Sequence, residues 1–165
     1  MADHPSRHER YSARPLPASR HVPGRGPRPE GGSGDDAFRH GVDLFNNGYW
    51  WEAHEAWEAV WMGLAPNSAE RHGIQAMIQV ANCFLKIAMG QDRAARLIRA
   101  DIERLFAAAL LHGPDLAIGG LALAPWSLKV FGYLDAVLEM AGPVHDPARY
   151  PYIVLPSSSS PGLTR

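Results

Sequence analysis

The chain has 165 residues, a length that is typical of one domain. Its formal net charge of −1 gives no reason to expect whole-molecule attraction to nucleic acid or to a membrane surface. The single cysteine, Cys83, excludes an intrachain disulfide, and its apolar helical surroundings favour an inert buried thiol. The sequence lacks an apolar stretch of membrane-spanning length and the apolar core of a signal peptide, so we expect a soluble, cytoplasmic protein.

The two ends of the chain differ in composition from its middle. Residues 1–34 are rich in Pro, Gly, Arg and Ser, and we predict a disordered tail, because such a segment buries too little apolar surface to offset its ordering entropy. Its arginines give it a basic bias, for which we expect a solubilising role rather than a nucleic-acid partner. Residues 156–165 are also predicted to be disordered. The remainder, residues 35–155, is predicted to be a single helical domain.

Apolar residues in the middle of the chain recur at helical spacing, and breakers separate the runs. Asn46, Asn47 and Gly48 end the first run, and the tight turn there makes the next helix antiparallel to it. We predict an all-α fold, a compact bundle of about five mostly antiparallel helices. The first expected helix is capped by Asp35 or Asp36, and the others are residues 49–62, 69–89, 93–112 and 126–141. Ser68 or Asn67 is expected to cap the third helix and Asp92 the fourth, with residues 115–125 as an apolar loop and residues 150–155 extended against the bundle.

The central helix, residues 49–62, holds four of the five tryptophans. Trp50, His54, Trp57 and Trp61 fall at i, i+4, i+7 and i+11, which places them on one face. That face is predicted to be buried, with Trp51 at its border. Four further positions are assigned from the same helical geometry: Glu58 on the same face, Glu55 at its shoulder, and Glu52 and Ala56 pointing away.

His54 and Glu58 are thus predicted to be ionisable groups inside an aromatic surface, where the loss of hydration must be offset by hydrogen bonding or charge pairing. Two explanations remain open. The pair is a structural polar cluster that fixes helix packing, or it is a site at which His54, Glu58 and Glu55 bind a metal or act as acid and base. Glu52 is predicted to be an ordinary solvated residue.

The third helix is expected to carry a polar strip between two apolar arcs, and the strip consists of His72, Gln75, Gln79, Asn82 and Lys86. Gln75 and Gln79 have the reach to hydrogen-bond a His–Glu pair on the facing helix. We therefore predict an interior site of His54, Glu58 and Gln79, with Glu55 and Gln75 in second rank.

The residues from His54 to Glu58 read HExxE. The zinc-peptidase pattern HExxH needs two histidines at i and i+4, with the intervening glutamate as base, and here the second histidine is replaced by Glu58. His54 and Glu58 can hold two corners of a divalent metal, and a third ligand would have to come from Gln75, Gln79 or His72, although amides are weak zinc ligands. We expect no cofactor, with a divalent metal as the one candidate.

Residues 45–61, FNNGYWWEAHEAWEAVW, resemble the FNxGxYWEAHExxExxW signature of a bacterial family known as domain of unknown function 309. Residues 73–81 are similar to its second block, with a departure at Ala76 and Met77, where the family has Gly and Leu. The resemblance spans about residues 37–112 and includes His54, Glu55, Glu58 and Gln79. It implies a compact all-helical bundle and no particular activity.

Two functions are compatible with these observations. The first is a small helical binding or interaction protein whose buried His/Glu/Gln cluster lines a cleft, with an unknown small molecule or protein as partner. The second is a divalent-metal-dependent hydrolase that uses His54, Glu55 and Glu58 of the HExxE helix. Neither reading requires nucleic acid or a membrane, and a homo-oligomer is compatible with both.

Overall fold

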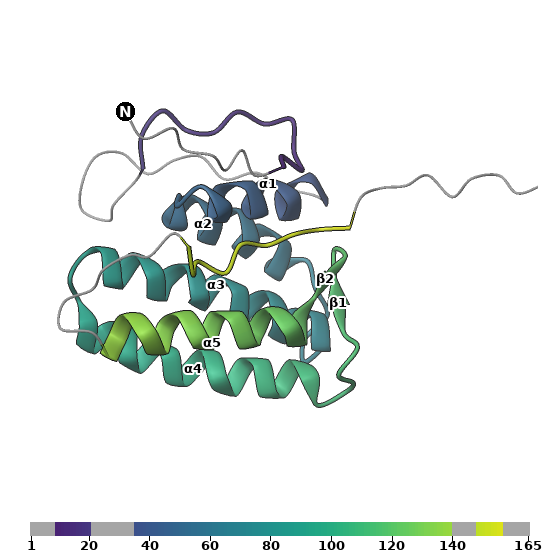
Figure 1. Ribbon diagram of the computed structural model, residues 1–165. Coiled ribbons are helices and arrows are strands. Elements are labelled where there is room, and N and C mark those ends of the chain that lie inside the picture. Colours follow the sequence, from purple (N-terminus) through teal and green to yellow (C-terminus); the bar gives the residue numbers. More distant parts are fainter. Residues whose placement is uncertain (1–8, 21–34, 140–147, 157–165) are drawn as a thin grey trace, which may run out of the picture.

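The computed structural model describes residues 9–20, 35–139 and 148–156, and these form a bundle of five helices with one short hairpin (Figure 1). The helices are α1 (Asp35–Asn46), α2 (Trp50–Met62), α3 (Ala69–Ala88), α4 (Asp92–Leu110) and α5 (Leu123–Glu139). The predicted all-α fold is confirmed. The predicted disorder of residues 1–8, 21–34 and 157–165 lies outside the described residues. Every helix in the described ranges is too short or too polar to cross a membrane.

The ends of the first three helices follow the predicted breakers closely. Gly48, with φ of +77°, ends α1 in the left-handed conformation that glycine adopts without strain. Ser68 caps α3 as predicted, because its Oγ accepts a hydrogen bond from the Arg71 backbone N–H at 3.1 Å. Asp92 does not cap α4, since it lies inside the helix and Gln91 occupies the cap position without a side-chain hydrogen bond.

A short hairpin replaces the loop that the sequence predicted at residues 115–125. Strands β1 (Ala117–Ile118) and β2 (Leu121–Ala122) pair antiparallel, with Ile118 opposite Leu121. Gly119 and Gly120 form the two-residue turn with φ of +56° and +88°, the positive values that such turns require. Helix α5 begins directly after the hairpin, at residue 123 instead of the expected 126.

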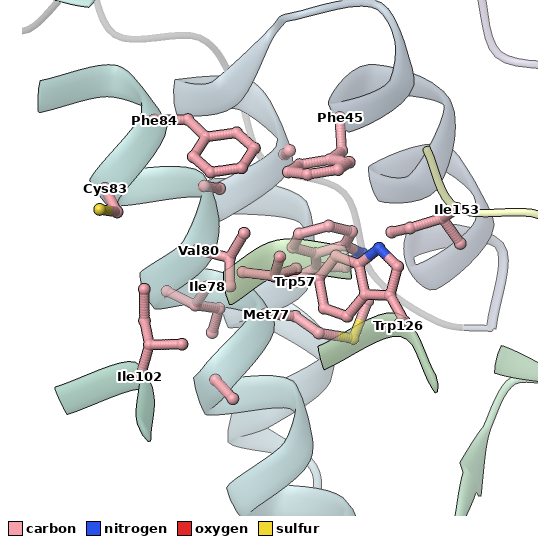
Figure 2. Close-up of a cluster of buried hydrophobic side chains, with 14 of the residues drawn as sticks. Phe45, Trp57, Met77, Ile78, Val80, Cys83, Phe84, Ile102, Trp126 and Ile153 are labelled. Carbon is pink, nitrogen blue, oxygen red and sulfur yellow. The ribbon is translucent and has the colours of Figure 1, made fainter. Parts of the chain in front are cut away.

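Helix α2 packs against both α1 and α3, and Trp57 fixes its orientation. The Trp57 side chain is fully buried, and its Nε1 donates to the backbone carbonyl of Phe38 at 3.2 Å. The indole lies against Gly41 of α1, where an added Cβ would overlap the ring. Figure 2 shows Trp57 within the core among side chains that include Phe45 and Trp126.

The buried face of α2 is not the one that the tryptophan spacing predicted. Ala53, Ala56 and Trp57 are its buried apolar residues, whereas the other three tryptophans are only half-buried. Glu52 is 6% exposed, so its assignment as a solvated residue was wrong. The reason is steric: the small alanines allow α2 to approach its neighbours closely, and this rotates the helix away from the face that its largest side chains suggest.

The extended segment 150–155 lies against the bundle, as predicted. The Asn46 side chain pairs with Ile153 in both directions, donating to its carbonyl at 2.9 Å and accepting from its N–H at 2.8 Å. The buried Tyr150 hydroxyl donates to the Phe45 carbonyl and accepts from Trp50 Nε1 at 3.1 Å. Burial raises the pKa of Tyr150 well above its ordinary value, so the hydroxyl stays neutral and can donate.

Residues 9–20, the N-terminal strap, correct the expectation that all of residues 1–34 form a disordered tail. The Asp43 carboxylate on α1 is buried and accepts the backbone N–H groups of Tyr11 and Ser12 at 2.8 and 2.9 Å. Arg10 Nε lies 3.0 Å from the same carboxylate, and the Tyr11 hydroxyl accepts from the Leu155 N–H at 3.1 Å. A buried carboxylate needs such partners, and the strap supplies them.

Gly41→Ala is expected to lower the free energy of unfolding by about 1–3 kcal/mol, because the new methyl group must displace the buried Trp57 ring. The matched control is Gly132→Ala on α5, where no atom lies within 4 Å of the added Cβ. That change should stabilise the protein by up to about 1 kcal/mol through helix propensity. Urea unfolding followed by tryptophan fluorescence measures both. A Gly41→Ala protein as stable as the wild type would contradict the packing role given to Trp57.

Asp43→Asn is expected to cost about 1–3 kcal/mol, because the amide N–H₂ would replace one of the two accepting oxygens and would face a backbone N–H group of the strap. The cost should largely vanish in a protein that begins at residue 21, since the strap is then absent and the two changes are not additive. Chemical denaturation of the wild type, Asp43→Asn, the truncated protein and truncated Asp43→Asn completes the double-mutant cycle. Asp101→Asn, at an exposed position, is the control. Equal costs with and without the strap would show that the strap does not stabilise this carboxylate.

Candidate functional site

His54, Glu55 and Glu58 form a compact cluster on α2. One possible ligand atom from each residue lies within 4.8 Å of the other two. His54 Nε2 is 3.4 Å from Glu58 Oε2, so the predicted pairing across one helical turn is present. The side chains of His54 and Glu58 are 19% and 34% exposed, which places the pair at the edge of the interior. The orientation that Trp57 imposes on α2 moves these groups to the flank of the helix.

The His54 imidazole has few polar contacts among the described residues. Its centroid lies 5.4 Å from that of Trp51 in an edge-on arrangement, and its Nδ1 is buried without a hydrogen-bond partner among the described residues. The 3.4 Å separation from Glu58 exceeds the usual 2.7–3.2 Å range of hydrogen bonds, so the two groups do not saturate one another. Lone pairs on both side chains therefore stay available to a ligand.

The amides of α3 lie on the predicted polar strip. Gln75, Gln79 and Asn82 are half-buried while their apolar neighbours are buried. Gln79 Oε1 accepts a hydrogen bond from Asn82 Nδ2 at 3.1 Å, which is a contact within α3. That Gln75 and Gln79 act together with His54 stays a prediction.

An imidazole with two carboxylates is a donor set that suits Zn²⁺ and similar divalent ions. Ligand atoms about 2.1 Å from a tetrahedral zinc lie roughly 3.5 Å apart, so side-chain rotation would bring the three groups from their present spacing to that geometry. Glu55 is the third donor that the spacing of His54 and Glu58 alone did not provide. The sequence predicts Glu55 only in second rank and places the third ligand on α3, at Gln75, Gln79 or His72.

A groove lined by described residues lies elsewhere. It has a volume of about 870 Å³ and is bordered by the N-terminal strap, α1, the second half of α2, the start of α3 and β1. His54, Glu55 and Glu58 do not line it. A cleft beside the His54 cluster therefore stays a prediction.

Besides Tyr150, the described residues Cys83 and His40 have shifted pKa values. Burial raises the pKa of Cys83 to about 12, and its Sγ lies 3.3 Å from the Ala95 carbonyl, which fits the inert thiol that the sequence predicted. Burial and then the nearby Arg14 guanidinium lower the pKa of His40. Both shifts stem mainly from desolvation, so neither indicates a reactive group.

Residues 38–98 match the model of the family described as "Domain of unknown function (DUF309)". This stretch is similar to the DUF309 family. The predicted family resemblance is confirmed, over a shorter range than the expected 37–112. The DUF309 match extends from α1 into α4 and so includes the whole His54 cluster and Gln79. The search of curated proteins and that of solved structures each found no match to the chain.

His54→Ala is expected to change the free energy of unfolding by less than about 1 kcal/mol, because the pair is partly exposed. Loss of one partner from a fully buried ion pair would instead cost about 3–5 kcal/mol. Urea unfolding of His54→Ala and Glu58→Gln distinguishes the two cases. Glu103→Gln is the control, since the i,i+4 contact of Glu103 with Arg99 has the same 3.4 Å separation. A loss of 3 kcal/mol or more would show that the pair is structural.

Proposed function

We propose that this protein is a small helical binding protein and that His54, Glu55 and Glu58 are its binding site. The proposed ligand is a divalent metal ion. The observation that carries the proposal is the approach of three possible ligand atoms to within 4.8 Å of one another.

Electrostatics support a cation at this position. Glu55 and Glu58 are three residues apart on one helix, and like charges at that spacing destabilise the helix when both are ionised. A divalent ion would relieve this repulsion. The imidazole of His54 favours Zn²⁺, Mn²⁺ or Fe²⁺ over Ca²⁺ and Mg²⁺, which prefer oxygen ligands only.

The test is calorimetric titration of untagged, chelator-treated protein with Zn²⁺ and Mn²⁺, together with melting curves. We expect one equivalent to bind, and the melting temperature to rise with the concentration of free ion, because the ion binds the folded protein preferentially. Affinity should fall at acid pH, since the imidazole must be neutral to coordinate a metal. His54→Ala and Glu58→Gln should each lose most of the affinity.

The matched control is Glu103→Gln, which also removes a carboxylate from an i,i+4 pair, and which should bind metal normally. Fe²⁺, added under anaerobic conditions, is the third ion to be titrated. The proposal fails if none of the three ions binds or stabilises the protein, or if His54→Ala binds as tightly as the wild type.

A metal-dependent hydrolase is the second candidate, and the position of Glu55 favours it. In HExxH peptidases the glutamate that follows the first histidine is the general base. If His54 and Glu58 hold the ion and Glu55 does not, Glu55 is placed to take a proton from a metal-bound water. Glu55→Gln separates the readings: a hydrolase variant keeps the metal and loses activity on a panel of ester and peptide substrates, whereas loss of a ligand weakens metal binding.

A further inference from the structure

We infer that the groove between the N-terminal strap, α1, α2, α3 and β1 is a second binding site. Its ligand is an amphipathic monocarboxylate, a molecule with an apolar body and one carboxylate head. This site shares no residue with the His54 cluster, so it does not depend on the proposed metal site.

The size and surface of the groove suit a small apolar ligand. Its volume of about 870 Å³ falls within the range of roughly 300–1,000 Å³ that is usual for small-molecule sites. Apolar side chains line it: Val60 on α2, Leu64 just after the end of α2, Ile74 on α3 and Ile118 on β1. Val60 and Leu64 are only half-buried, so an apolar ligand would remove further apolar surface from water.

The charges along the groove favour an anionic head on one side. Three charged residues line it, namely Asp36, Arg39 and Glu70. Asp36 is already neutralised, because Arg14 Nε lies 2.9 Å from its carboxylate and the Ser12 hydroxyl donates to it at 3.2 Å. Arg39 is exposed and makes no ion pair or hydrogen bond with another described residue.

A guanidinium that has no partner among the described residues and lies beside an apolar surface matches a carboxylate well, since its fork of N–H groups binds both carboxylate oxygens at once. Glu70 lies on the α3 wall and repels a second anion there. A single carboxylate is therefore directed to Arg39 on α1, and the apolar body extends toward Ile74 and Ile118. The opposed charges of Arg39 and Glu70 thus set the orientation of the ligand as well as its charge.

The strap completes the groove. Tyr11, Ser12 and Ala13 form one wall, and the buried Asp43 carboxylate anchors the first two of them through their backbone N–H groups. A ligand in contact with this wall stabilises the docked strap. Asp43→Asn should accordingly weaken ligand binding although Asp43 does not line the groove.

The experiment is calorimetric titration of the full chain with dodecanoate below its micellar concentration, with dodecylamine and a dodecyl glycoside as comparisons. We expect dodecanoate to bind one-to-one and more tightly than either comparison. Arg39→Gln should weaken it at least tenfold, and Glu70→Gln should leave it unchanged or tighten it. Arg93→Gln, an exposed arginine on α4, is the matched control and should bind like the wild type.

Ala59→Trp places a large ring in the groove and should abolish binding, with circular dichroism to confirm that the variant folds. His54→Ala should bind dodecanoate like the wild type, and this result would show that the groove binds its ligand independently of the proposed metal site. The inference is overturned if dodecanoate does not bind, if Arg39→Gln binds as tightly as Arg93→Gln, or if dodecylamine binds best and loses affinity in Glu70→Gln. Because Arg39 and Glu70 are surface residues, those two variants test the inference even if Ala59→Trp does not fold.

Discussion

The contact between Trp57 and Gly41 sets the position of the central helix. A glycine at this point of α1 leaves room for the indole, and the Phe38 carbonyl gives its N–H a hydrogen-bond partner inside the core. A buried indole N–H without a partner would be costly, so the ring has one orientation that is both packed and satisfied. The rotation of α2 about its axis follows from this contact, and so does the direction in which every other side chain of the helix points.

The chemistry of the candidate site depends on that rotation. Had the face through Trp50, Trp57 and Trp61 been the buried one, His54 and Glu58 would have lain in the core, where an ionisable pair is retained only if it is fully hydrogen-bonded. In the structure the pair is partly exposed and its N–O separation is 3.4 Å. At that separation the two groups do not saturate one another, which is compatible with the ligand site proposed above.

Two segments without regular structure complete the bundle. Residues 150–155 lie against α1 through Asn46, and the strap lies against it through Asp43. Tyr11 joins them, because its hydroxyl accepts the Leu155 N–H. Both of these α1 side chains are buried and polar, and each is satisfied by backbone from a distant part of the chain. The strap also provides a wall of the groove, so this polar pairing shapes the second site.

The sequence by itself determined where the first three helices lie and that His54 and Glu58 belong to one cluster. Periodicity, Gly48 and Ser68 placed the first three helices, since caps and breakers act locally, and the HExxE spacing placed His54 and Glu58 one turn apart. Only the tertiary structure decided which face of α2 is buried, that Glu52 lies inside and that residues 9–20 are docked. These outcomes depend on the space between helices and on partners more than thirty residues away, such as Asp43 for Tyr11, and local composition carries no information on either.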